Sequence, residues 1–357
     1  MSIIKYLKLM VKENASDLFY HQAKDIRFRI DGEIKIIDRL DLSKDDVFKA
    51  IEEITNEAQR EKLKINKDLD FTFYLKDIDA HFRVSIFLQR NTPSIVVRNL
   101  SQPIRSFEEL NLPAEVLKKL CGERRGLVLL VGSAGSGKST TIASMIEYIN
   151  NNFCKHILTI EEPIEFYFED KKSVINQREL GVDVPSYSAA LRAFTLQSPD
   201  VIYIGNIRDY ETMSASITAA ETGVLVLSTL HTVNASQTIE RIVNFFPPYQ
   251  HNEVRHQISY LLKGIISLRL VPLKDRAGRI PACEIMLFTP TIARLIREGR
   301  IEEINRFIEE GGIFGMQSFT QALVKLVKDG LVSEKVAEDF SDNRDEFILA
   351  LKGIKKI

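Results

Sequence analysis

A glycine-rich loop constrains the fold of this chain more than any other feature. It lies within GLVLLVGSAGSGKSTTIASMIEYI, which begins at residue 126. An apolar strand pattern precedes the loop and helical spacing follows it, and the loop fits G-x-x-x-x-G-K-[ST] at Gly132, Gly137, Lys138 and Ser139. Glycines let successive backbone N–H groups converge on phosphate oxygens, and the start of a helix adds partial positive charge. The sequence therefore predicts a phosphate-binding loop between a buried strand and a helix.

The residues of this loop predict a nucleotide ligand. We expect Lys138 to reach the β and γ phosphates and Ser139 to offer its hydroxyl to Mg²⁺, so ATP or ADP with Mg²⁺ are the expected ligands. An ordinary glycine-rich turn is the alternative, but the flanking strand and helix patterns argue against it. The full predicted nucleotide-binding set in this segment is Gly132, Ser133, Ala134, Gly135, Ser136, Gly137, Lys138, Ser139 and Thr140.

Changes in the hydrophobic pattern divide the chain into four parts. Residues 1–100 indicate a small α+β domain, with helical stretches at 3–12 and 43–64 and a strand hairpin at Asp31-Gly32. The segment 101–113 carries prolines and no clear period, which predicts a linker. Apolar strands alternate with longer helical stretches over 114–290, as is typical of a mostly parallel sheet. Residues 291–357 are expected to be helical, and their tail from Ser341 is either a docking segment or disordered.

The composition argues against several classes of protein. The 357 residues include 48 Lys and Arg against 49 Asp and Glu, and this net charge of −1 gives no field that favours nucleic acid or an anionic membrane. The three cysteines, Cys121, Cys154 and Cys283, are too scattered for a disulfide framework or a zinc ribbon. No apolar run approaches the roughly 18 residues of a membrane helix, and residues 1–10 lack the pattern of a signal peptide. We expect a cytoplasmic protein that binds no nucleic acid.

Acidic residues and a histidine follow two further apolar strand patterns. HILTIEEPIEFYF places Glu161, Glu162 and Glu165 after one strand, and VLVLSTLHTVNA places His231 after another. Because ligands gather at the carboxyl ends of parallel strands, these residues are candidates for the chemistry at the phosphates. A solvated acidic loop and a packed or solvent-facing histidine are the alternatives, and neither motif decides the matter alone.

Taken in order, these motifs resemble the hexameric ATPases of type IV pilus retraction, the PilT and PilU family, within the secretion ATPase superfamily. The resemblance covers nearly the whole chain and rests on GSAGSGKSTT, HILTIEEPIEF, INQREL, SPDVIYIGNIRDYETM, AAETGVLVLSTLHT, RIVNFFP, PTIARLIREG and FGMQSF. RELGVDV, NASQTIERIVNFFP and the tail are more similar to PilU than to PilT. The assembly ATPases of the superfamily usually carry a tetracysteine zinc insert, which three cysteines cannot build.

The resemblance implies an α/β fold with a RecA-like P-loop ATPase core. It also implies an N-terminal PAS-like α+β domain, indicated by MVKENASDLF, FRIDGEI and HFRVSIFLQR, and a C-terminal helical region. It further implies a cytoplasmic homo-hexamer that is peripheral to the inner membrane through its partners alone. Those partners are the platform protein of the pilus and another retraction ATPase ring.

The resemblance also gives roles to individual residues. Glu165 corresponds to the glutamate that orients or deprotonates the attacking water, Glu161 to a support of the metal region, and His231 to a sensor near the γ-phosphate. Glu162 stands where the family most often has aspartate.

Several arginines are further candidates under the same resemblance. Arg83, Arg90 and Arg98 alternate along one strand region and resemble the arginines that reach the phosphates as neighbouring units close. Surface charges on an edge strand are the alternative for these three. Arg178 and Arg208 are weaker candidates, for which structural ion pairing is an equal alternative.

Asn206 is the main departure from the family pattern. It stands in VIYIGNIRD, where the family normally has a glutamate, and TLQSPD replaces the usual LRxDPD at Leu196 and Ser198. An amide is neutral and donates protons through its NH₂ group, so it serves poorly beside Mg²⁺. We therefore expect retained ATP binding with slow hydrolysis, or hydrolysis that depends on an active partner ring. The alternative is that Glu165 suffices and Asn206 is tolerated.

A helix near the C-terminus is expected to take part in pilus retraction. TIARLIREG separates basic and apolar faces, with Arg294, Leu295 and Arg297 on a helix that the family associates with retraction; a plain packing helix is the alternative. The expected function is a hexameric motor that couples ATP hydrolysis and domain closure to pilus retraction in twitching motility. An accessory nucleotide-binding ring with little turnover, and a type II secretion or DNA-uptake ATPase of the same fold, are the alternatives.

Overall fold

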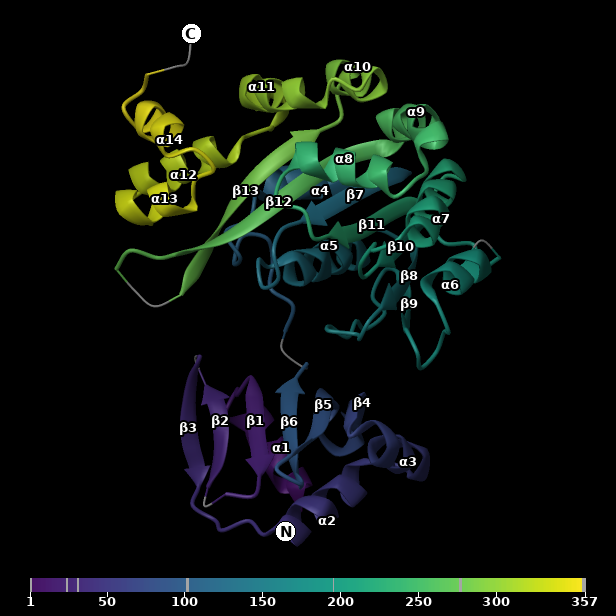
Figure 1. Ribbon diagram of the computed structural model, residues 1–357, viewed down its shortest axis with the longest axis vertical. Helices are drawn as coiled ribbons and strands as arrows, with labels where there is room; N and C mark the ends of the chain where they lie inside the picture. Colours follow the sequence, from purple (N-terminus) through teal and green to yellow (C-terminus); the bar gives the residue numbers. More distant parts are fainter. Residues whose placement is uncertain are drawn as a thin grey trace. The chain divides into compact units, whose positions relative to one another are not determined.

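Two β-sheets organise the chain, one antiparallel with six strands and one mostly parallel with seven (Figure 1). The computed structural model describes residues 2–23, 25–30, 32–100, 103–194, 196–275 and 278–354. The chain forms two compact units. Unit 1 comprises Met1–Pro103 and Pro163–Tyr167, and unit 2 comprises Ile104–Glu162 and Phe168–Ile357. A short segment of the later sequence therefore belongs to unit 1.

Unit 1 is an α+β unit whose sheet has the strand order β3-β2-β1-β6-β5-β4. Strand β5 alternates buried and half-exposed residues, so one sheet face packs against the helices while the other does not. Asp31 of the predicted hairpin turn lies outside the described residues, but β2 and β3 pair antiparallel around it. The elements are α1 (Ile3–Lys12), β1 (Asp17–His21), β2 (Ile26–Ile30), β3 (Glu33–Asp38), α2 (Lys44–Ile54), α3 (Glu57–Asn66), β4 (Asp68–Leu75), η1 (Lys76–Ile78), β5 (Ala80–Gln89) and β6 (Thr92–Asn99).

The helical stretch expected over 43–64 consists of two helices rather than one. Ser43 and Asp46 form a capping box at the start of α2, and Asn56 and Gln59 form a second one at the start of α3. Each box satisfies backbone N–H groups that a helix start leaves without partners. The second box therefore starts a new helix in the middle of the stretch.

Unit 2 has the strand order β13-β12-β7-β11-β10-β8-β9, in which only the β12–β13 pair is antiparallel. Helices lie on both faces of this sheet (Figure 1). Its elements up to residue 287 are α4 (Ala114–Cys121), β7 (Gly126–Val131), α5 (Lys138–Asn152), β8 (His156–Glu161), β9 (Val174–Glu179), α6 (Tyr187–Phe194), β10 (Val201–Ile204), α7 (Tyr210–Glu221), β11 (Leu225–Leu230), α8 (Ala235–Asn244), η2 (Pro248–Gln250), α9 (His251–Leu261), β12 (Leu262–Pro272) and β13 (Arg279–Leu287).

The central strands of unit 2 are buried on both faces, which explains their unbroken apolar runs. Every residue of β7 and of β11 is buried. Val128 and Leu130 pack in the core under α4 and α5, whereas Leu127 and Leu129 pack in the core under α7, α8 and α9. The strand, loop and helix expected around the glycine-rich run are therefore present, and the α/β class is confirmed.

Residues 290–351 are mostly helical, as expected. Thr289 caps α10, Pro290 occupies its first turn, and Gly299 ends it in the left-handed conformation with a φ of 73°. Of the two alternatives for the tail, disorder is wrong as far as Leu351, because α14 buries Phe347 against α12. The elements are α10 (Pro290–Glu298), η3 (Ile301–Glu303), α11 (Ile304–Glu310), η4 (Gly311–Phe314), α12 (Phe319–Lys328), α13 (Glu334–Phe340) and α14 (Arg344–Leu351).

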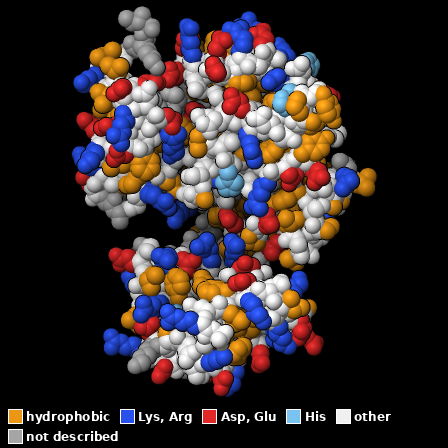
Figure 2. Space-filling model, viewed as in Figure 1, with side chains coloured by type: hydrophobic (Ala, Val, Ile, Leu, Met, Phe, Trp, Pro, Cys, Tyr) orange, Lys and Arg blue, Asp and Glu red, His pale blue; other side chains and the backbone are white. Residues whose placement is uncertain are grey.

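The surface shows no large area of one charge on the face in Figure 2, where basic and acidic side chains are interspersed on both units. No helix in the described part of the chain is both long and apolar enough to cross a membrane.

Candidate functional site

The glycine-rich loop joins β7 to α5 by a tight turn that requires glycine at its first position. Gly132 has a φ of 147°, and a Cβ atom there would lie 2.5 Å from Ser136 Oγ and 2.6 Å from the carbonyl oxygen of Leu268. Gly137 precedes α5 with a φ of 96°, also in the left-handed region. The backbone therefore curls closely over the start of α5, as a phosphate-binding loop does.

Lys138 lies inside this curl. Its ammonium group donates hydrogen bonds to the carbonyl oxygens of Gly132 at 2.8 Å and Ser133 at 2.9 Å, and its side chain is buried. The buried hydroxyl oxygen of Ser136 has no hydrogen-bond partner among the described residues. A buried polar atom without a partner is costly, so the loop is suited to a ligand that carries hydrogen-bonding oxygens.

The register of the parallel strands brings the other candidate segments of unit 2 to the same edge. Val131 pairs with Leu230, and Ile204 pairs with both Ser228 and Ile160. Gly132, His231 and Gly205-Asn206 follow the ends of β7, β11 and β10, and Glu161 is the last residue of β8. The glycine-rich loop, Glu161, Asn206 and His231 therefore share the carboxyl edge of one sheet, where ligands of such folds bind.

Glu161 is a buried carboxylate that local hydrogen bonds hold in place. Its Oε1 accepts from the hydroxyl of Thr159 at 2.7 Å and from the amide of Gln177 at 3.2 Å. Glu161 is the last residue of β8, so its backbone is fixed by the sheet. A fixed acidic group at this edge is suited to orienting water around a divalent cation.

Asn206 is held on both sides by backbone hydrogen bonds. Gly205 N donates to Ile160 O at 2.8 Å, and Ile207 N donates to Thr229 O at 3.0 Å. Asn206 is 7% exposed, and its Oδ1 has no hydrogen-bond partner among the described residues. This amide oxygen is positioned to accept a hydrogen bond from a ligand or an ordered water at the sheet edge.

His231 follows β11 and is an exposed residue. Partial burial, followed by the positive charges of Lys138 and Arg208, lowers the pKa of His231 below its usual value of 6.5. This shift favours the neutral imidazole, and part of it comes from the charge of Lys138 in the loop. A neutral ring at this place can donate or accept a hydrogen bond.

Arg208 and Arg178 have structural partners. Arg208 pairs with Glu162 at 3.2 Å, so the ion-pair alternative is observed for this residue. Arg178 donates to the carbonyl oxygen of Asp183 at 3.0 Å, which ties β9 to the loop after it.

The other candidates belong to unit 1. Arg83 on β5 and Arg98 on β6 are cross-strand partners, so they lie on the same face of the sheet. Arg98 also pairs with the buried carboxylate of Asp17 at 3.1 Å. The expectation that three arginines alternate along one strand region is wrong, because Arg90 lies in the turn after β5 with a φ of 49°.

Glu165 is exposed and lies in the segment Pro163–Tyr167, which belongs to unit 1.

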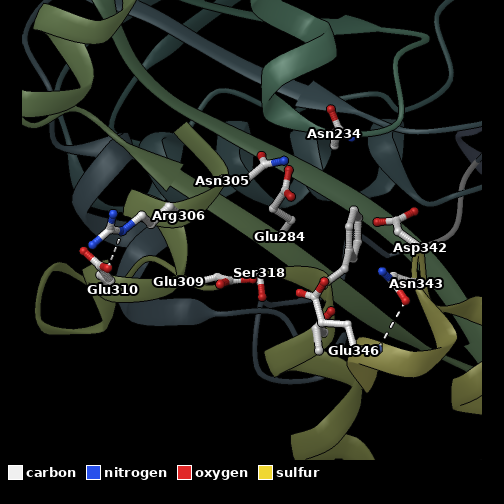
Figure 3. A pocket seen from close by; sticks show the side chains of 12 residues that line it. Asn234, Glu284, Asn305, Arg306, Glu309, Glu310, Ser318, Asp342, Asn343 and Glu346 are labelled. Atoms are coloured by element: carbon white, nitrogen blue, oxygen red, sulfur yellow. Dashed lines mark hydrogen bonds and ion pairs between the residues drawn. The ribbon is translucent and has the colours of Figure 1, made fainter. Parts of the chain in front are cut away.

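A separate acidic cavity of about 630 Å³ in unit 2 contains none of the predicted site residues (Figure 3). The carboxylate of Glu284 is buried there and accepts from Ala235 N at 2.7 Å and from Ser267 Oγ at 3.0 Å. Burial raises the pKa of Glu284 above its usual range. Arg306 pairs with Glu310 at 2.8 Å (Figure 3). Glu284 was not among the predicted site residues, although a glutamate inside the apolar run ACEIML indicates a buried carboxyl group.

The described residues include no group of three or more His, Cys, Asp or Glu side chains that could hold a metal by themselves. Magnesium usually keeps several waters and binds through one or two protein groups together with substrate phosphates. Ser139 at the start of α5, the fixed carboxylate of Glu161 and the unpartnered oxygen of Asn206 fit that mode of binding.

The chain is similar to a group of secretion and pilus proteins over most of its length. Residues 2–322 match a family model described as Type II/IV secretion system protein. The type IV pilus ATPase PilU of Pseudomonas aeruginosa is 39% identical over 99% of this chain and 92% of its own. The type IV pilus retraction ATPase PilT of the same organism is 40% identical over 95% of this chain and 98% of its own. These identities do not separate a PilU-like chain from a PilT-like one.

Solved structures agree with this similarity. The crystal structure of the pilus retraction motor PilT with bound ADP has a TM-score of 0.89, with 40% identity over 97% of this chain and 98% of that one. The ATPase DotB of Legionella pneumophila has a TM-score of 0.79, with 26% identity over 94% of each chain. The RecA-like secretion ATPase fold is thereby confirmed.

Proposed function

Because the chain belongs to the Type II/IV secretion system proteins and, within them, to the type IV pilus retraction ATPases, we propose that it is an ATP-driven motor of pilus retraction. One observation carries the proposal at the level of residues. The glycine-rich loop, Glu161, Asn206 and His231 meet at the carboxyl edge of the sheet in unit 2. A nucleoside triphosphate bound at this edge would lie beside groups that can act on its γ-phosphate.

The nucleotide is held by unit 2 in this proposal. Backbone N–H groups of residues 132–140 surround the phosphates, and Lys138 exchanges its bonds to Gly132 and Ser133 for bonds to phosphate oxygens. Mg²⁺, when bound through Ser139, neutralises charge on the β and γ phosphates. Glu161 orients water beside it, and neutral His231 donates a hydrogen bond towards the γ-phosphate.

The remaining catalytic groups belong to unit 1. Glu165 orients or deprotonates the attacking water, and Arg83 and Arg98 neutralise charge on the transferring phosphoryl group. The phosphate loop belongs to the other unit. Membership of the retraction ATPase family favours domain closure during turnover. We propose that this closure is the step that couples hydrolysis to movement in a homo-hexameric ring.

Asn206 weakens turnover in this account. A carboxylate at its place would accept two or more hydrogen bonds from metal-bound water, whereas the amide offers one neutral oxygen. Loss of a charge-assisted hydrogen bond costs about 1.5–3 kcal/mol, which is roughly a ten- to hundredfold reduction in rate if it is fully expressed in the transition state. The protein therefore binds ATP and hydrolyses it slowly by itself.

The amide of Asn206, in place of a carboxylate, also favours a second candidate function. A ring with weakened turnover can act as an accessory that works with a fully active retraction ATPase ring on the platform protein of a type IV pilus. In either role the protein is cytoplasmic and reaches the inner membrane through those partners alone. The remaining alternative within the superfamily is an ATPase of type II secretion or DNA uptake.

Phosphate release tests the proposal. Purified wild-type protein is compared with Asn206→Glu, with Lys138→Ala as the inactive control, and each is measured alone and mixed with an active retraction ATPase. The motor proposal predicts slow release that Asn206→Glu increases roughly ten- to hundredfold. Release that Asn206→Glu leaves unchanged contradicts the role given to Asn206, and release that survives Lys138→Ala contradicts the site.

A further inference from the structure

The connection between β8 and β9 passes from one unit to the other. Glu161 and Glu162 belong to unit 2, Pro163–Tyr167 belongs to unit 1, and Phe168 belongs to unit 2 again. Glu162 and Glu165 are three residues apart in sequence, yet they belong to different units. Whatever holds the short segment to unit 1 therefore determines with which unit Glu165 moves.

An aromatic stack attaches this segment to the sheet of unit 1. The ring of Tyr167 lies on the ring of His81, with centroids 3.6 Å apart and an angle of 15° between the planes. His81 also stacks with Tyr74, at 4.5 Å and 23°. Tyr74 and His81 are cross-strand partners on β4 and β5, and the hydroxyl of Tyr74 donates to Asp79 at 2.8 Å. Tyr167 thus packs on a pair of rings that the sheet itself positions.

The stack lies on the face of the sheet that carries the candidate arginines. Along β5, Ala80, Phe82 and Val84 point into the helix-covered core, whereas His81 and Arg83 lie on the opposite, half-exposed face. Arg83 is the cross-strand partner of Arg98 on β6. The segment that bears Glu165 is therefore attached two residues along the strand from Arg83.

We propose that His81 and Tyr167 are positioning residues, whose stack fastens the segment Pro163–Tyr167 to unit 1 so that Glu165 moves together with Arg83 and Arg98. The inference rests on the proposed role of Glu165 in hydrolysis. The water-activating carboxylate and the two arginines then form one preassembled group within unit 1. Without the stack, Glu165 is held to unit 1 less firmly, so the catalytic group is assembled less often.

Fluorescence tests the contact without any assay of hydrolysis. The chain contains no tryptophan, so Tyr167→Trp introduces a single emitting ring at the stack. Adding His81→Ala is expected to shift the emission to longer wavelength and to increase quenching by acrylamide, because the ring loses its cover. Ser85→Ala, on the same strand and face, is the matched control and is expected to change neither. Emission that is the same with and without His81 overturns the proposal.

Kinetics test the positioning role, in the Asn206→Glu background so that a slow rate does not hide the effect. His81→Ala is expected to lower kcat roughly three- to tenfold with an unchanged KM for ATP, whereas His81→Phe keeps a stacking ring and restores most of the rate. An equal loss in His81→Phe, a rise in KM in place of the fall in kcat, or an unchanged kcat overturns the proposal.

Glu165→Ala separates this inference from the proposed function. If Glu165→Ala leaves turnover unchanged, the proposed role of Glu165 is wrong and the positioning role falls with it, even where the fluorescence shows the stack. If Glu165→Ala abolishes turnover while His81→Ala does not lower it, the proposed function stands and the positioning role is overturned.

Discussion

The ammonium group of Lys138 lies 2.8 Å from the carbonyl oxygen of Gly132, so the first and last parts of the glycine-rich loop are joined by a hydrogen bond. The bond closes the loop around a positive charge at the carboxyl edge of the sheet. A phosphate that enters this loop meets the charge of Lys138 together with the backbone N–H groups at the start of α5. We therefore expect the affinity for nucleotide to depend on Lys138 more than on any charge elsewhere in unit 2.

Replacement of Lys138 by alanine is expected to weaken ATP and ADP binding roughly ten- to hundredfold, since a charge-assisted hydrogen bond to phosphate is lost. Calorimetric titration measures the change. Lys155→Ala is the matched control, because Lys155 pairs with Asp200 at 3.5 Å and lies on the amino-terminal side of β8. Equal losses of nucleotide affinity in both variants would contradict a specific contact between Lys138 and phosphate, because removal of any positive charge would then have the same effect.

Gly132 and Gly135, two of the three loop glycines that have positive φ, are expected to differ in their tolerance of alanine. Gly132→Ala places a Cβ within 2.6 Å of two oxygen atoms, whereas Gly135 has a φ of 73° with no atom within 4 Å of such a Cβ. We expect a loss of about 3 kcal/mol or more in the free energy of unfolding for Gly132→Ala, and of about 1–2 kcal/mol for Gly135→Ala. Denaturant unfolding gives both values. Similar losses would contradict the close packing at Gly132.

Much of the nucleotide-binding half of the fold could be predicted from local sequence. The apolar runs of β7 and β11 are continuous because both faces of these strands are buried, and the glycine pattern fixes the loop that follows β7. The class of fold and the strand ends that carry Glu161 and His231 follow from this periodicity alone. These features depend on residues that are close together in the sequence.

Features that depend on distant contacts could not be predicted in this way. The sequence of 163–167 does not show that Tyr167 stacks on His81, which lies far earlier in the chain on β5. The position of Arg90 depends on where the turn between β5 and β6 begins. The formation of α14 depends on burial of Phe347 in a small separate core. Each outcome is set by packing partners that local periodicity does not identify.

The pKa of His231 is expected to respond to the charge at Lys138. Lys138→Ala removes one of the positive charges that lower this pKa, so the pKa of His231 should rise towards 6.5. The folded state favours neutral His231, so its contribution to stability is complete above the unfolded value and is lost as the pH falls through the lower folded value. NMR titration of labelled histidine gives the pKa. An identical pKa in wild type and Lys138→Ala would contradict the proximity of the two groups.

Arginines on α10 are expected to affect retraction without affecting stability. Arg294 and Arg297 are exposed, whereas Leu295 is buried in the core of unit 2. Alanine at either arginine should change the free energy of unfolding by about 0.5 kcal/mol or less and leave ADP affinity unchanged while twitching motility is lost. Leu295→Ala should cost about 2–5 kcal/mol. Loss of ADP affinity together with motility in the arginine variants would refute this assignment.

Arg83 and Arg98 are expected to differ in their structural roles while both support turnover. Arg98 is one of two arginines that pair with buried Asp17, the other being Arg29, so Arg98→Ala should lower the melting temperature. Arg83 has no ion pair among the described residues, so Arg83→Ala should leave the melting temperature unchanged and lower turnover by about tenfold or more. Full turnover of Arg83→Ala would contradict the proposed contact with phosphate.

The central claim is that residues 132–139 bind a nucleoside triphosphate, and thermal unfolding with a non-hydrolysable ATP analogue and Mg²⁺ tests it most directly. At a ligand concentration of about 100 times Kd, the account predicts stabilisation of wild type by about 2.7 kcal/mol and a clear rise in Tm. It predicts little or no rise in Lys138→Ala. An unchanged Tm of wild type at millimolar analogue, or an equal rise in both proteins, would contradict the claim.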